Sequence, residues 1–200
     1  MADSSFDVLV IGSGASGLAA AVSANRAGAR VALATKGALQ SCNSAKAQGG
    51  IQAAFGDDDS PEQHAADVWT SSHETADRGL VEILTGEAPT AIHWLEELGV
   101  EFTRENGGYR LARCGGASRK RLLQVGDRTG HAITTALRDS AESSGVQTFP
   151  KSPLADLART LSQLDAAVYA ARYEDGRLLE LDQAYERALE LVSAGRRVSS

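Results

Sequence analysis

The spacing of apolar positions changes repeatedly near the start of the chain. The run 6–11 is apolar without helical spacing and leads directly into glycines, which predicts a strand and a tight turn. The alanine-rich stretch 18–27 predicts a helix that stops at Gly28. A second apolar segment, 29–35, predicts another strand. Together these elements predict a βαβ unit of about 30 residues with two parallel strands.

Helical patterns return after the segment 37–56, which is rich in small and polar residues and predicts irregular backbone. Ser60 and Pro61 are the residue types preferred at the N-cap and the first position of a helix, which we expect to run to residue 71. Three further helices are predicted at 77–85, at 89–98 and from 129 or 130 to 144. A third parallel strand is predicted at 146–149.

The pattern changes again from residue 152 onward. Apolar positions between Leu154 and Ala171 are spaced by three and four residues, which is typical of a helical seam. Glu174-Asp175-Gly176 interrupts the seam before a second such stretch, so 153–194 is predicted to form an αα-hairpin. The sequence thus predicts an α/β fold, with a Rossmann-like parallel sheet in residues 1–151 and a helical hairpin in residues 152–200.

Composition and charge exclude several classes of protein. The chain has 200 residues, 42% of them apolar, which is enough for a globular core. Its net charge of −6 gives no electrostatic reason to expect nucleic acid or an anionic membrane as a partner. The acidic start is unlike a secretory signal and no apolar run has the length of a membrane span, which favours a cytoplasmic location.

The cysteines, the histidines and the basic triplet do not by themselves predict a catalytic or metal site. The two cysteines lack metal-ligand spacing and predict neither a disulfide scaffold nor a zinc site. We interpret the basic triplet 119–121 as a solvated turn. The histidines, including His64, are interpreted as satisfied surface or helix-terminal residues.

Candidate chemistry begins with the turn that follows the first strand. Gly12, Gly14 and Gly17 match the GxGxxG pattern, in which the glycines permit a tight turn, close approach to a pyrophosphate and close helix–strand packing. The phosphates would bind at the N-terminus of the following helix, where backbone N–H groups lack partners. This predicts a dinucleotide site.

The end of the second predicted strand leaves the choice of dinucleotide open. Many such sites have an acidic residue there to bind a ribose hydroxyl, whereas this sequence has Lys36, which accepts no hydrogen bond. The residues themselves are compatible with either NADP or a flavin.

Four ordered segments resemble one enzyme family, that of the succinate dehydrogenase and fumarate reductase flavoproteins and L-aspartate oxidase. The resemblance covers about residues 6–154 and rests on Thr35-Lys36-Gly37, on Asn43-Ser44-Ala45-Lys46-Ala47-Gln48-Gly49-Gly50 and the residues up to 54, on Cys114-Gly115-Gly116, and on Gly126-Asp127-Arg128-Thr129-Gly130-His131. It implies that residues 1–151 are the N-terminal part of an FAD-binding domain. The cofactor contacts that the turn and the resemblance together predict are Gly12, Ser13, Gly14, Ala15, Ser16, Gly17, Lys36, Asn43, Ser44, Ala47, Gln48, Gly49, Gly50 and Asp127.

The resemblance also implies how FAD is held. In the membrane-bound members of the family a histidine in the second segment is bonded covalently to the flavin, and Asn43 stands at that position here. The expected cofactor is therefore noncovalent FAD.

The implied reaction is hydride transfer between the flavin and a small dicarboxylate or L-aspartate. Aspartate oxidases typically have glutamate before the paired glycines, where this chain has Cys114, a poor partner for an ammonium group. Residues 127–131 are closer to the succinate dehydrogenase form, so both substrate classes stay open. The family's catalytic residues lie later in its chain, and none is assigned here.

Two alternatives accompany this reading. One is a noncatalytic flavin-binding or interaction module, in which the hairpin mediates oligomerisation or binds a partner. The other is an NADP-binding protein.

Overall fold

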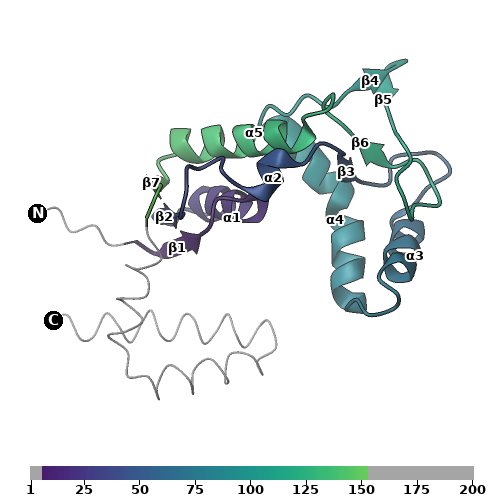
Figure 1. The fold of residues 1–200 in the computed structure, drawn as a ribbon, viewed down its shortest axis with the longest axis horizontal. Coiled ribbons are helices and arrows are strands. Elements are labelled where there is room, and N and C mark those ends of the chain that lie inside the picture. Colours follow the sequence, from purple (N-terminus) through teal and green to yellow (C-terminus); the bar gives the residue numbers. More distant parts are fainter. Residues whose placement is uncertain (1–5, 153–200) are drawn as a thin grey trace, which may run out of the picture. The chain divides into compact units, whose positions relative to one another are not determined.

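The computed structural model describes residues 6–152, and the predicted hairpin lies outside the described residues. Strand β1 (Val8–Ile11), helix α1 (Ala15–Arg26) and strand β2 (Val31–Ala34) form the predicted βαβ unit. The strands are parallel, with Val8 opposite Val31. Strand β7 (Gln147–Phe149) pairs in parallel with the other edge of β2, giving the order β1-β2-β7 (Figure 1). The structure confirms a mixed α/β fold with a parallel sheet, and the division into domains stays a prediction.

The main core lies where α1 and α5 (Thr129–Ser143) pack on each other, with α1 also packed on the sheet. It includes Leu18 and Val22 of α1, Leu33 of β2 and Leu137 of α5, each at most 1% exposed. Burying such a side chain contributes about 1.5–3 kcal/mol. The glycine-rich turn between β1 and α1 is thus attached to elements that contribute fully buried side chains to the core.

Helices α3 (Pro61–Ser71) and α4 (Arg78–Glu97) lie side by side (Figure 1). Ser60 caps α3 as predicted, because its hydroxyl accepts a hydrogen bond from the Gln63 N–H at 3.2 Å. The prediction of two helices at 77–85 and 89–98 is wrong, since α4 runs through Pro89 without interruption. A proline inside a helix costs about 3 kcal/mol. Burial of one continuous face offsets that cost, with Val81, Thr85, Ile92 and Leu95 on both sides of the proline.

The segment predicted to be irregular contains short elements that depend on distant partners. Helix α2 spans Asn43–Lys46, and strand β3 (Ile51–Gln52) pairs antiparallel with β6 (Leu122–Leu123). Outside this segment, a small hairpin joins β4 (Arg104–Glu105) to β5 (Gly108–Tyr109). Within residues 6–152 no helix is long and apolar enough to cross a membrane.

Candidate functional site

The glycine-rich turn has the close helix–strand approach that its pattern predicts. The Gly12 N–H donates to the Ala34 carbonyl at 2.8 Å, which ties the turn to β2. Gly12 has a φ of +103°, a conformation that favours glycine. A Cβ atom on Gly17 would lie 2.0 Å from the Gly12 carbonyl oxygen, so only glycine fits at residue 17 without movement.

The N-terminus of α1 is open to an anion. Its N-cap residue, Gly14, offers no side-chain cap, and the first turn contains no acidic residue. The Ala15 N–H donates to the Ser44 hydroxyl at 3.2 Å, while the N–H groups of Ser16 and Gly17 have no partner within the helix because of their position in its first turn. Partnerless N–H groups and the helix dipole favour negative charge here. The residues present therefore fit the pyrophosphate of a dinucleotide.

The Ser13 side chain is buried and bonded within the fold. Its buried hydroxyl donates to the Thr35 hydroxyl at 3.1 Å and so links the ends of β1 and β2. Any contact of Ser13 with a cofactor would have to come from its backbone.

Helix α5 holds the second predicted cofactor segment against the turn. The Gly130 N–H donates to the Ala47 carbonyl at 2.9 Å. A Cβ atom on Gly130 would lie 1.9 Å from the Ser44 carbonyl oxygen. Thr129 supports the same junction, since its hydroxyl accepts from the Val125 N–H at 3.0 Å. Thr129 and Gly130 were not among the predicted site residues, although the motif 126–131 contained the signal.

Strand β6 supports the glycines that follow α2. Gly50 has a φ of +148°, and a Cβ atom there would lie 2.4 Å from the Leu123 carbonyl oxygen. The Gly49 carbonyl accepts a hydrogen bond from the Gln124 side chain at 2.7 Å. The close approach to Leu123 explains why glycine is required at residue 50, whereas a Cβ atom on Gly49 would meet nothing within 4 Å.

Other predicted contacts are exposed. Their side chains make no hydrogen bond to the rest of residues 6–152, and their roles stay predictions; they are Lys36, Asn43, Gln48 and Asp127. Among the described residues no cluster of His, Cys, Asp and Glu could hold a metal ion.

A buried ionic cluster lies away from the turn, at the start of β6. The Arg121 side chain is fully buried, and it donates to Asp59 from Nε at 2.8 Å and from Nη2 at 2.7 Å. Its Nη1 donates to Asp67 at 2.6 Å. The interpretation of 119–121 as a solvated turn is therefore wrong for Arg121. The error arose because both carboxylates are distant in the sequence.

Arg121 lowers the pKa of both carboxylates, and at Asp67 it does so together with Ser118. Its hydrogen bond is the main cause that lowers the pKa of Asp59, and burial opposes it. At Asp67 burial tends to raise the pKa, but hydrogen bonds from Ser118 and Arg121 outweigh it and the pKa falls. Both groups are therefore carboxylates at neutral pH.

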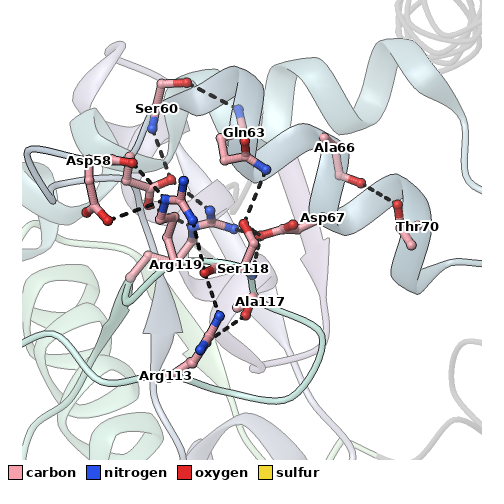
Figure 2. Close-up of polar contacts among 12 residues, drawn as sticks. Asp58, Ser60, Gln63, Ala66, Asp67, Thr70, Arg113, Ala117, Ser118 and Arg119 are labelled. Atoms are coloured by element: carbon pink, nitrogen blue, oxygen red, sulfur yellow. Dashed lines mark hydrogen bonds and ion pairs between the residues drawn. The ribbon is translucent and has the colours of Figure 1, made fainter.

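Asp67 also fixes the loop that carries Cys114. It accepts hydrogen bonds from the Ser118 N–H at 2.7 Å and the Ser118 hydroxyl at 2.9 Å (Figure 2). Arg113 donates to the carbonyls of Ala117 and Ser118 at 3.1 and 2.7 Å and closes the loop from the other side (Figure 2). The loop 113–118 is thus held on α3 by the Asp67 carboxylate and by the Gln63 side chain, which also donates to the Ser118 hydroxyl.

His64 adjoins this cluster and is buried, with 4% of its surface exposed. Its Nδ1 atom has no hydrogen-bond partner among the described residues. Burial, and then the charge of Arg121, lower the pKa of His64. The interpretation as a satisfied surface or helix-terminal histidine is wrong here, because α3 turns this side chain inward.

This burial predicts a pH dependence of stability. As the pH falls below about 6.5, His64 takes up a proton in the unfolded chain but stays neutral in the folded one, so the free energy of unfolding should fall. The loss should continue until the pH reaches the lowered pKa of the folded state. Urea unfolding at several pH values measures this dependence. The free energy of unfolding should change less with pH in His64→Leu than in the native chain. The matched control is His73→Asn, because His73 is exposed and its φ of +54° suits asparagine. An unchanged slope in His64→Leu would contradict the assignment.

Comparison with known proteins gives a consistent set of relatives. The model of a family described as FAD binding domain matches residues 7–189. L-aspartate oxidase of Streptomyces coelicolor is 38% identical over 153 residues, covering 76% of this chain and 26% of the relative. L-aspartate oxidase of Nostoc is 40% identical over 136 residues, covering 68% of this chain and 23% of the relative.

Solved structures give the same picture. Mycobacterium smegmatis Sdh1 in complex with UQ1 matches with a TM-score of 0.69 and 30% identity, over 73% of this chain and 27% of that one. The FrdA chain of E. coli quinol fumarate reductase matches with a TM-score of 0.70 and 27% identity, over 73% of this chain and 26% of that one. The chain thus spans about a quarter of the length of these relatives.

Proposed function

This chain belongs to the FAD binding domain family, and we propose that the turn between β1 and α1 binds the pyrophosphate of FAD through the backbone N–H groups of Ser16 and Gly17. The observation that carries the proposal is the α1 N-terminus, which has no side-chain cap and no acidic residue in its first turn. The Ser44 hydroxyl, which accepts from Ala15, can donate its own proton to a phosphate oxygen.

The remaining predicted contacts extend the site along the cofactor. We propose that Lys36, two residues beyond β2, offers a positive charge near the turn. Residues 48–50 follow α2, which α5 holds close to the start of α1, and we propose that they contact the flavin ring. Asp127, close to the start of α5, is proposed as a further contact.

For the reaction we propose hydride transfer between FAD and a small dicarboxylate or L-aspartate. FAD supplies the redox chemistry when bound, and this part of the chain orients it. The family supports both substrate classes, because its relatives here include L-aspartate oxidases and a fumarate reductase. Cys114, on the loop held by Asp67, favours the dicarboxylate, since a thiol is a poor partner for the ammonium group of aspartate.

A second candidate is a module that binds flavin without turnover by this chain alone. It is favoured by one observation, that the residues matched to the relatives cover about a quarter of their length. The two candidates share the cofactor site and differ in whether substrate reduces the flavin.

Flavin content tests the proposal directly. We expect the purified chain to retain FAD or to take it up when FAD is added. Acid precipitation should release the flavin into the supernatant, because Asn43 cannot form the histidine–flavin bond of the covalent enzymes. Flavin in the protein pellet would contradict noncovalent binding, and a chain that binds no FAD at all would overturn the proposal.

Substrate reduction then separates the two candidates. Under anaerobic conditions succinate or L-aspartate should bleach the flavin absorption if the chain catalyses the reaction. Bound flavin that neither compound reduces would favour the noncatalytic module. Preference for NADP over FAD in a binding competition would support the alternative of an NADP-binding protein.

A further inference from the structure

The short β3–β6 ladder ends in an unusual way. Ile51 pairs with Leu123, and the Ala53 N–H donates to the Arg121 carbonyl at 3.0 Å. Two residues further in this register, Gly49 would pair with Val125. The Val125 N–H instead donates to the Thr129 hydroxyl, and the Gln124 side-chain N–H donates to the Gly49 carbonyl at 2.7 Å. A side chain thus replaces a backbone donor at the end of the ladder.

Gln124 is held through both its backbone and its side chain. Its backbone carbonyl accepts from the Thr103 N–H at 2.8 Å, and the Thr103 hydroxyl accepts from the Gly126 N–H at 3.3 Å. The Arg110 guanidinium donates to the Gln124 Oε1 atom at 3.4 Å. Because the oxygen faces Arg110, the amide nitrogen faces Gly49.

This arrangement orients the peptide between Gly49 and Gly50. No peptide bond in the described part of the chain is cis, so the Gly50 N–H points opposite to the Gly49 carbonyl. The N–H groups of Gly49 and Gly50 have no acceptor within residues 6–152. Gly50 also lies against Leu123, which limits rotation of the peptide. Gln124 therefore orients the Gly50 N–H, which has no acceptor in the described chain, away from β6.

We infer that Gln124 is a positioning residue that fixes the Gly49–Gly50 peptide so that the Gly50 N–H donates to an acceptor atom on the flavin ring of FAD. The inference rests on the proposed function, because it takes FAD as the ligand. Gln124 acts only through the peptide and does not touch the cofactor.

Binding by the full chain provides the first test. Gln124→Leu removes the donor, and Gln124→Glu replaces it with an acceptor of the same shape that repels the Gly49 carbonyl. The loss of one oriented hydrogen bond is expected to raise the Kd for FAD about three- to tenfold, more for Glu than for Leu. The visible absorption bands of bound flavin should also shift, which a loss of stability alone would not cause. A Kd and spectrum equal to those of the native chain in both variants would overturn the inference.

The matched control is Gln63→Leu. Gln63 also donates one side-chain hydrogen bond, to the Ser118 hydroxyl at 3.2 Å, but at the loop 113–118. This variant should leave the Kd and the flavin spectrum unchanged. An equal effect in Gln63→Leu would attribute the change to general destabilisation and overturn the inference.

A measurement without cofactor separates this inference from the proposed function. In the FAD-free chain, the NMR amide signal of Gly50 should move in Gln124→Leu and stay in Gln63→Leu, because only Gln124 bonds to the adjoining carbonyl. An unmoved Gly50 signal would overturn the positioning role even if FAD binds. If the native chain binds no FAD while the Gly50 signal moves, the positioning stands but the proposed function and the flavin contact both fail.

Discussion

Replacing Arg121 with methionine is expected to lower the free energy of unfolding at pH 7 by about 3–5 kcal/mol. The guanidinium lies between Asp59 and Asp67, with the Arg121 and Asp59 side chains fully buried and the Asp67 side chain 14% exposed. Its removal leaves two carboxylates close together without a countercharge. Urea unfolding monitored by circular dichroism measures the loss, and retention of full stability would contradict a role for this cluster.

The control is Arg119→Met, two residues away. Arg119 is 41% exposed and its carboxylate partner Asp58 is 79% exposed, and such surface pairs contribute about 0–1 kcal/mol. We therefore expect little change in this variant. A loss as large as that of Arg121→Met would show that the segment 119–121, and not the buried cluster, is responsible.

The loss of unfolding free energy in Arg121→Met should be larger at neutral pH than at acidic pH. In the native chain the pKa values of Asp59 and Asp67 are lowered, so their stabilisation is present above about pH 4 and is lost as the pH falls through the folded pKa values. Without Arg121, burial of Asp59 is no longer offset by its main hydrogen bond, and Asp67 keeps only the hydrogen bonds from Ser118, so both carboxylates become less favourable in the folded variant as the pH rises. The two stability curves should converge toward acidic pH. In addition, Asp59→Asn should recover part of the stability of Arg121→Met at pH 7.

Replacing Gly17 with alanine is expected to weaken FAD binding by about 100-fold. The added Cβ atom would lie 2.0 Å from the Gly12 carbonyl oxygen, so α1 and the turn must move apart. That movement displaces the N–H groups proposed to bind the pyrophosphate. Isothermal titration with FAD measures the effect, and an affinity within threefold of native would contradict this role of the turn.

Gly86→Ala is the matched control. Gly86 lies within α4, and a Cβ atom there would meet nothing within 4 Å. Alanine is favoured over glycine inside a helix by about 0.5–1 kcal/mol, so this variant should be slightly more stable and bind FAD normally. The contrast separates the geometry of one glycine from the general effect of adding a methyl group.

Local features were predicted well from the sequence. Gly12 and Gly17, Ser60 and Gly28 each act on residues a few positions away, so their types and spacing were sufficient. The Gly28 φ of +89° and the Ser60 cap agree with those predictions. Predicting the βαβ unit required only that the strand and helix patterns follow each other in order.

Features that depend on distant partners were missed. The burial of Arg121 depends on carboxylates contributed by the region around α3, and the inward position of His64 depends on the same packing. Pro89 signals a helix break locally, but burial on both sides of it keeps α4 continuous. Gln124 gave no signal at all, because its role arises only where β6 runs beside residues 49–50.

The contact of Gly130 with Ser44 and Ala47 has a consequence for biosynthesis. A ribosome releases α1 and α2 long before α5, and until α5 docks nothing in the described chain holds the Ala47 carbonyl. The nascent polypeptide therefore carries the turn between β1 and α1 early, but the proposed cofactor site is complete only after α5 docks. FAD that binds at the proposed site would therefore bind after α5 has been synthesised, and not while the first helices emerge.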